Sequence, residues 1–163
     1  MIGIGRHTDY AARIVLHLAC LPAGARVTAA EIARQRLLPP PFIRRIVGRL
    51  AAAGILRTSR GAGGGVALAR TPAEISLLDV LRAMEGGVTL NACVDTPKSC
   101  PLARSCPVNR AWAAATRSLE ADLAAVRFDR LADPLEHRVA HAGYRRAEAT
   151  SRSTRAAGPD RRR

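Results

Sequence analysis

The chain has 163 residues, a formal net charge of +13 and a sequence pI of about 11.4. This length allows one domain of ordinary size plus an appendage, and the basic excess favours a polyanionic partner, with nucleic acid preferred over a membrane surface. A membrane span is not expected, because the apolar run from Ile14 to Leu21 is interrupted by His17 and is too short to cross a bilayer. With no visible signal peptide, we expect a cytoplasmic protein.

Capping patterns predict the first two helices. Thr8 or Asp9 is expected to cap a first helix, because both side chains accept hydrogen bonds from free N–H groups at a helix start. Thr28 followed three residues later by Glu31 forms a capping-box pattern, which predicts a short second helix ending near Arg36.

Prolines 39–41 predict the start of a third helix, since proline is tolerated in a first turn, and Gly54 is expected to end it. The apolar side of this helix is expected to contain Phe42, Ile43, Ile46, Val47 and Leu50. Its opposite side is expected to carry Arg44, Arg45 and Arg49. Two helices, a tight connection and a basic third helix predict a helix-turn-helix, although a solvated basic face on an ordinary bundle is an alternative.

A glycine-rich hairpin is expected next. The segments 55–60 and 66–70 are strand candidates, and four glycines lie in the connection 61–65. A nucleotide-binding loop is disfavoured, because no Gly-Lys-Ser/Thr follows the glycines. After a helix-turn-helix this hairpin is typical of a wing, whose Arg60 would enter a minor groove. The fold class predicted is therefore mainly α: a winged helix-turn-helix with a two-stranded wing and a long C-terminal dimerisation helix.

Two further helices and a tail complete the chain. Ser76 is expected to cap a helix over 77–85, with Leu77, Leu78, Leu81 and Met84 inward. A long helix should follow Pro107, with a stripe formed by Trp112, Ala115, Leu119, Leu123 and Val126. The stripe can pack on its own domain or on a second copy, and we favour a homodimer. The expected domains are 1–87 for DNA binding, 88–134 for the cysteine loop and dimerisation helix, and 135–163 as a basic, disordered tail.

Three cysteines form the candidate metal site. Cys93, Cys100 and Cys106 follow the spacing Cys-x6-Cys-x5-Cys, which suits a metal or an iron–sulfur cluster and makes a poor disulfide framework. Zinc with a fourth ligand and a thiol switch remain open. An enzyme is not expected, because Asp95 is the only acidic residue in this loop and no His or carboxylate forms a nucleophile–base pattern with the cysteines.

Four segments together resemble one known family. The run Thr8-Asp9-Tyr10-Ala11, the wing Arg60–Gly65, the segment Ile75–Val80 and the three-cysteine loop ending near Trp112 resemble the Rrf-type winged-helix iron–sulfur transcriptional regulators, which include the IscR, NsrR and RirA groups. The resemblance covers roughly residues 5–133. It implies a homodimer in which the three cysteines ligate a two-iron or four-iron cluster.

The resemblance also bears on the fourth cluster ligand. In NsrR-like members it is the Asp of the Thr-Asp-Tyr run, supplied across the dimer, which carries over to Asp9. In IscR-like members it is a histidine three residues after the last cysteine, and this chain has Asn109 there. The match therefore leans toward the NsrR and RirA groups. Asp9 as a helix cap and His7 as a ligand are the alternatives.

These observations predict a DNA-binding transcriptional repressor whose affinity is gated by an iron–sulfur cluster sensing nitric oxide, iron or redox state. Its partners would be double-stranded DNA and a second copy of the chain, with no membrane. The residues expected to contact DNA are Thr28, Pro41, Arg44, Arg45, Arg49, Arg60 and Gly63. The alternatives are a thiol-redox or zinc-dependent DNA-binding regulator without a cluster, and a cluster-binding scaffold that does not bind DNA.

Overall fold

The computed structural model describes residues 3–61 and 64–132, so the expected basic tail lies outside the described residues. The helices are α1 (Arg6–Ala19), α2 (Ala29–Arg36), α3 (Pro40–Ala52), α4 (Leu77–Glu85), α5 (Ala92–Asp95), α6 (Pro107–Ala125) and α7 (Phe128–Leu131). Strands β1 (Leu56–Ser59) and β2 (Gly65–Leu68) form an antiparallel hairpin, and short 3-10 turns η1 (Pro72–Glu74) and η2 (Pro97–Ser99) precede α4 and the last two cysteines. The predicted fold class, a mainly helical winged helix-turn-helix, is confirmed.

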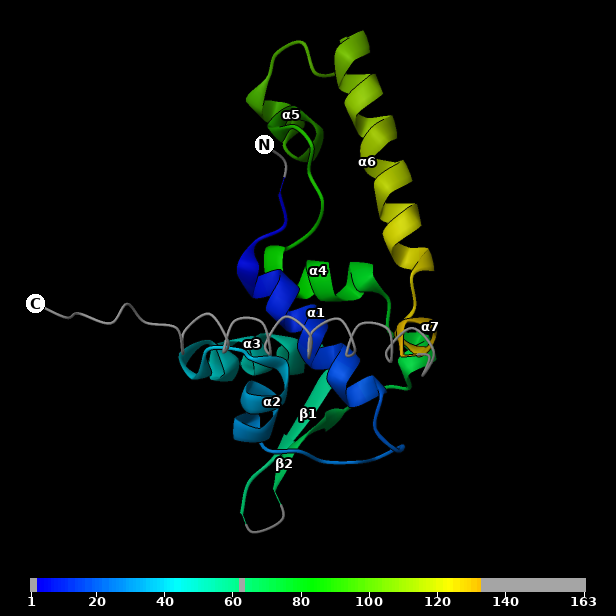
Figure 1. Cartoon of the computed structure of the whole chain (residues 1–163). Helices are drawn as coiled ribbons and strands as arrows, with labels where there is room; N and C mark the ends of the chain where they lie inside the picture. Colours follow the sequence, from blue (N-terminus) through cyan, green and yellow to red (C-terminus); the bar gives the residue numbers. More distant parts are fainter. Residues whose placement is uncertain (1–2, 62–63, 133–163) are drawn as a thin grey trace, which may run out of the picture.

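The molecule has a helical body with two projections in opposite directions (Figure 1). Helices α1 to α4 form the body, and the β1–β2 hairpin extends from one side of it. Helix α6 rises from the other side, with α5 and its loop alongside. Within the part of the chain that is described, no helix combines the length and apolar character needed to cross a bilayer.

The start of α2 agrees with its prediction, whereas the start of α1 does not. Thr28 and Glu31 form both halves of the capping box, with the Thr28 N–H donating to Glu31 Oε2 over 2.8 Å. Helix α1 begins earlier than expected, after Gly5, and no side chain of its own caps it. Glu85 at the end of α4 instead accepts hydrogen bonds from the Gly5 N–H (3.0 Å) and the Thr8 hydroxyl. The prediction that Thr8 or Asp9 caps α1 is therefore wrong, because the Glu85 carboxylate accepts the hydrogen bonds at the start of this helix.

The core lies between α1, α3 and α4 and under the wing. Its fully buried large side chains are Ile14, Val15, Ile32, Ile43, Ile46, Leu50, Ile55, Ile75, Val80 and Phe128. Of the five residues predicted to face inward from α3, four are buried and Phe42 is not. Phe42 is wrong, since its side chain is 41% exposed and its ring lies against His7, with 5.0 Å between ring centroids. At 100° per residue, Phe42 falls at the edge of the buried side of the helix.

Helix α7 was not predicted, and it brings the end of the chain's described part back to the hydrophobic core. The segment after α6 pairs with the segment before α4: the Leu77 N–H donates to the Val126 carbonyl (2.9 Å) and the Phe128 N–H to the Ile75 carbonyl (3.1 Å). Phe128 is 1% exposed and packs in the core formed by α1 and α3. The long helix is thus anchored at its base to the helix-turn-helix body.

Two glycines of the wing lie where the fold leaves no room for a side chain. A Cβ on Gly64 would lie 2.5 Å from the Ser59 carbonyl oxygen, and one on Gly65 would lie 2.9 Å from the Val27 carbonyl oxygen. Val27 adds a bridge to β2, exchanging two backbone hydrogen bonds with Val66. The missing side chain at Gly64 therefore lets the hairpin turn back on itself, and that at Gly65 lets β2 lie against the chain before α2.

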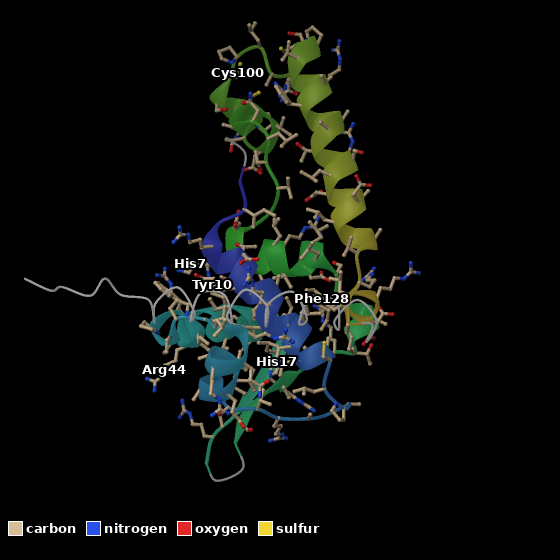
Figure 2. All side chains as sticks on the ribbon, in the orientation of Figure 1. His7, Tyr10, His17, Arg44, Cys100 and Phe128 are labelled. Carbon is tan, nitrogen blue, oxygen red and sulfur yellow. The ribbon has the colours of Figure 1, made fainter. Side chains whose placement is uncertain are left out.

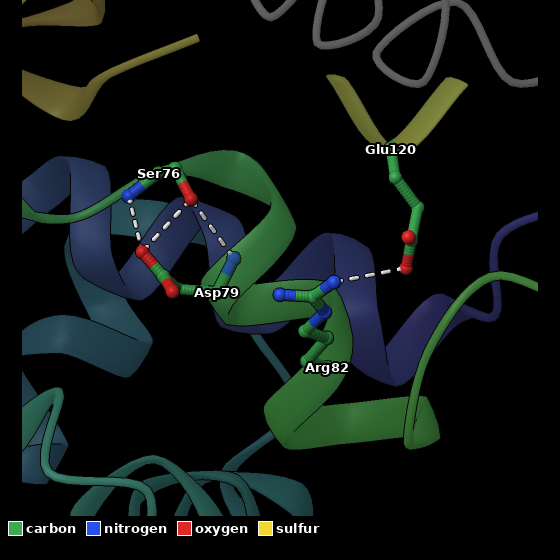
Figure 3. A network of polar contacts seen from close by, with 4 residues as sticks. All are labelled: Ser76, Asp79, Arg82 and Glu120. Atoms are coloured by element: carbon green, nitrogen blue, oxygen red, sulfur yellow. Dashed lines mark hydrogen bonds and ion pairs between the residues drawn. The ribbon is translucent and has the colours of Figure 1, made fainter. Parts of the chain in front are cut away.

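Figure 3 shows two sets of polar contacts of α4, one that caps its own start and one that joins its middle to α6. Ser76 and Asp79 form the predicted cap as a full capping box, with the Asp79 carboxylate accepting from the Ser76 N–H over 2.8 Å. One turn later, Arg82 makes an ion pair with Glu120 of α6, with 3.1 Å between Nη2 and Oε1. Together with the hydrogen bonds of Glu85 to the start of α1, this ion pair places α4 between the helical body and the long helix.

Candidate nucleic-acid interface and cysteine loop

The exposed side of α3 is basic. Pro41, Arg44, Arg45 and Gly48 are all exposed and lie opposite the buried residues of the helix. Arg44 extends away from the body at the end of the molecule formed by α2 and α3 (Figure 2). The helix contains no acidic residue, so this surface carries positive charge only. Such a surface suits the phosphates and guanine edges of a DNA groove.

Arg49 is placed differently from the other arginines of α3. Its Nη1 donates a hydrogen bond to the Met84 carbonyl oxygen near the end of α4, over 2.7 Å. Because the guanidinium satisfies a carbonyl at a helix C-terminus, Arg49 joins the basic helix to α4. Arg49 therefore has a role inside the fold as well as the DNA contact predicted for it.

The remaining residues predicted to contact DNA lie at the two edges of this surface. Thr28 is exposed and its hydroxyl belongs to the capping box of α2. Arg60 is exposed directly after β1, where the wing begins to turn. Gly63 lies outside the described residues. Nearby, Arg26 donates to the Ser59 hydroxyl over 2.8 Å, so an arginine that was not predicted also lies at the base of the wing.

The three cysteines lie on one excursion of the chain between α4 and α6. Cys93 is in α5, Cys100 follows a short turn, and Cys106 is the residue before α6; all three are half-buried. Among the residues described, no three His, Cys, Asp or Glu side chains are gathered closely enough to hold a metal ion. The Asn109 amide nitrogen donates to the Cys93 carbonyl (2.9 Å) and contacts its Sγ at 3.2 Å.

Asp9 is not gathered with the cysteines into a group that could hold a metal ion among the described residues of one chain. Its carboxylate is about half exposed and makes an ion pair with Arg13, one turn along α1, at 3.0 Å. A role for Asp9 as a cluster ligand would therefore require a second chain, as the resemblance implies.

Comparison with known proteins identifies the family. Residues 4–134 match the Rrf2 family, described as an iron-dependent transcriptional regulator. The chain belongs to the Rrf2 family. It is 34% identical over 133 residues to the HTH-type transcriptional regulator NsrR of Geobacillus kaustophilus, covering 81% of this chain and 88% of NsrR. It is also 34% identical over 108 residues to the protein aau3 of Rhizobium meliloti, covering 65% of this chain and 69% of aau3. The regulators it resembles place it in a non-enzymatic family.

Solved structures show that the same fold occurs in this family. CymR, described as the global cysteine regulator of B. subtilis, aligns with a TM-score of 0.67 at 24% identity over 81% of this chain and 97% of CymR. IscR of T. potens aligns with a TM-score of 0.64 at 24% identity over 81% of this chain and 88% of IscR. At this identity the likeness concerns the fold. The role comes from the family match over residues 4–134: the chain is an Rrf2-family transcriptional regulator, a family that acts by binding DNA.

The contacts of Glu85 and Asn109 are among those that were not predicted from the sequence of this Rrf2 chain. Glu85 joins α4 to the start of α1, and Asn109 contacts Cys93. The only sequence signal for Asn109 was its position, three residues after Cys106, where IscR-like members have a histidine. For Glu85 the sequence carried no signal, because its partners lie about eighty residues away.

Among the described residues, the first half of α6 carries apolar side chains that no other element covers. Trp112 is 40% exposed and Val108 is 59% exposed, and Ala115 is exposed between them and the half-buried Leu119. Thr116 is the only fully buried residue of this helix. Leu123 and Val126 are half-buried like Leu119, so the exposed part of the predicted stripe is its first part, at Trp112 and Ala115.

Proposed function

We propose that this Rrf2-family regulator is a repressor whose DNA affinity is controlled by an iron–sulfur cluster held by Cys93, Cys100 and Cys106. The observation that carries the proposal is the position of three half-buried thiols on a single loop, joined by Gly86 and Gly87 to the end of α4. Three thiolates are the donors that such clusters take, so the residues fit the group by their chemistry. The loop must close to bring them together.

DNA recognition is assigned to α3 and the wing. Arg44 and Arg45 enter the major groove, where a bidentate contact with guanine discriminates between bases by about 1–3 kcal/mol. Arg60 enters the adjacent minor groove from the start of the wing. Because the arginines also neutralise phosphates, affinity should fall steeply as salt concentration rises.

Homodimerisation is assigned to the apolar stripe of α6. A second copy would cover Trp112 and Ala115, which the chain itself leaves exposed. Two copies related by two-fold symmetry present two α3 helices, so the operator should be an approximate palindrome. Asp9 of the partner subunit is the candidate fourth ligand. To bind the cluster, its carboxylate would have to break the ion pair with Arg13 and reach the cysteine loop of the other copy.

Control of DNA binding is assigned to the contacts at the end of α4. When bound, the cluster supplies iron that reacts with nitric oxide or oxidants. Closure of the cysteine loop would move Gly86 and Gly87 and hence Glu85, which contacts α1, and Met84, whose carbonyl is bonded to Arg49 of α3. A coupling of about 1–3 kcal/mol would change DNA affinity 5- to 150-fold.

The first test is iron and acid-labile sulfide per chain in protein purified without air, with an absorption spectrum. The expected result is near-stoichiometric iron and sulfide with broad visible absorption, lost in Cys100→Ser. DNA binding to a selected operator is then compared with and without the cluster. Colourless protein that resists reconstitution would overturn the cluster. If an oxidant still changed the DNA affinity of that protein, a thiol switch would replace the cluster as the proposed sensor. The three thiols could act in this way without being gathered as a metal site among the described residues.

A further inference from the structure

Gly48 lies in the interior of α3, where glycine is unfavourable. Glycine destabilises a helix interior relative to alanine, because it loses more backbone freedom on folding. The fold gives no reason for it, since a Cβ at Gly48 would meet nothing within 4 Å. Its backbone is helical and it is absent from the described glycines with positive φ. Alanine would therefore fit this position and stabilise the helix.

Neighbouring glycines are explained by the fold, which sets Gly48 apart. Gly54, just after α3, has a φ of 68°, a conformation that side chains rarely adopt. Gly64 and Gly65 approach backbone atoms more closely than any Cβ would permit. When the fold does not need the missing side chain, the remaining use of glycine is a close approach by a second molecule.

The surroundings of Gly48 indicate which molecule approaches. Gly48 lies one turn after Arg44 and on the same exposed side as Pro41 and Arg45, in steps of four and three residues. The side contains two arginines without an acidic residue, and its other members are short. The complementary partner is a polyanion with a concave surface, which is what the DNA major groove offers.

We propose that Gly48 is the point at which α3 approaches DNA most closely, so that the helix lies deep enough for Arg44 and Arg45 to reach base edges. The inference rests on the proposed DNA-binding function and deepens it by naming a residue that sets specificity through position. A methyl group at residue 48 would hold the helix axis farther out and leave both arginines nearer the phosphates.

The test compares Gly48→Ala with the wild-type full-length protein. An operator is first selected from random double-stranded DNA with the wild type, and affinities for the operator and for random DNA are then measured at one salt concentration. Gly48→Ala is expected to raise Tm and to weaken operator binding by about tenfold, with a much smaller loss on random DNA. A rise in Tm excludes unfolding as the cause of the loss.

Gly3→Ala is the matched control, because a Cβ there also meets nothing within 4 Å and the residue lies outside the helix-turn-helix. It should leave operator binding unchanged. Unchanged operator affinity in Gly48→Ala, or equal losses on operator and random DNA, would overturn the inference while the proposed function stands. A wild type that selects no DNA sequence, with or without reconstitution of the cluster, would overturn both.

Discussion

Leu37 occupies a backbone conformation that disfavours its own side chain. It follows α2, with a φ of 53° and 55% of its surface exposed, and it is the one non-glycine residue with positive φ among those described. A left-handed conformation costs a residue with a Cβ about 1–2 kcal/mol, whereas glycine adopts it freely. Leu37→Gly should therefore raise the free energy of unfolding by about 1 kcal/mol, measured by urea denaturation. Leu37→Ala keeps the Cβ and should show no such gain; equal stability of the two variants would contradict this account.

Phe128 is the residue through which the end of the long helix is held to the body. Its side chain is 1% exposed in the core and is labelled at the base of α6 in Figure 2. Truncating a buried Phe removes its apolar contacts and leaves a cavity, which costs about 3–5 kcal/mol. Phe128→Ala should therefore lower the free energy of unfolding by about that amount in chemical denaturation, whereas Phe128→Leu should lose less. A loss under 1 kcal/mol for the Ala variant would mean that α7 is not part of the core.

Local signals were predictable and distant partners were not. The capping boxes at Thr28 and Ser76 join residues three apart, so the sequence itself contains both halves of each contact. The predicted cap of α1 was wrong because its actual partner, Glu85, lies far along the chain. The predicted burial of Phe42 was wrong because the position of its ring depends on His7 of another helix. The cysteine spacing predicts a shared loop, but no periodicity rule fixes the conformation in which three thiols of an irregular segment meet.

At the scale of elements, the cap of α4 should make stability depend on pH. Burial raises the pKa of the Asp79 carboxyl, but hydrogen bonds from the Ser76 N–H and hydroxyl outweigh it, so the pKa lies below its ordinary value. A folded pKa below the unfolded one stabilises the protein above the unfolded pKa, near 4, and this contribution is lost as pH falls through the folded pKa. Asp79→Ala should thus cost about 1 kcal/mol at pH 7, with the difference shrinking below about pH 4.

The check on Asp79 is thermal or urea unfolding of both proteins from pH 7 to pH 2. In the background of Ser76→Ala, the loss of stability caused by Asp79→Ala should depend less on pH, because the Ser76 hydroxyl no longer donates to the carboxylate. A difference between wild type and Asp79→Ala that stays constant across this range would mean that the carboxylate charge does not contribute.

The end of α4 joins the cysteine loop to the basic helix α3. Glu85 accepts two hydrogen bonds from the start of α1, and the adjacent Met84 carbonyl accepts one from Arg49. Glu85→Ala should reduce the ratio of DNA affinities between the two states of the loop severalfold, because the loop would then move α4 without moving α1. The measurement is DNA affinity with and without the cluster, in wild type and variant.

Glu74→Ala provides the control for that experiment, because the Glu74 carboxylate caps the 3-10 turn before α4 by accepting hydrogen bonds from Thr71, whereas that of Glu85 accepts them from the start of α1. Its affinity ratio should equal that of the wild type. If Glu85→Ala responded to the cluster as strongly as the wild type, the signal would have to pass through α6 instead, where Arg82 and Glu120 join the two helices.

At the scale of the whole molecule, the cysteine loop and the wing lie at opposite ends, with the helical body between them (Figure 1). A ligand at the loop therefore cannot contact DNA held by α3 and the wing. It must act by changing the arrangement of elements, either within one chain through α4 or between two chains through α6. The exposed stripe on α6 makes the second route dependent on a dimer.

Trp112→Glu tests that dependence. It places a charge in the stripe, where burial against a second copy would be costly, while the 40% exposed Trp112 contributes less to its own chain than a core residue does. The expected result is a folded monomer in sedimentation, with weaker operator binding and a salt dependence of affinity about half as steep, since one copy neutralises about half as many phosphates. Ala114→Glu adds the same charge at an exposed position on another side of α6 and should remain dimeric. If Trp112→Glu stayed dimeric, the stripe on α6 would not be the interface between the two copies. If the wild type sedimented as a monomer, no two-fold symmetry would align two recognition helices on a palindrome, and control would have to act within a single chain.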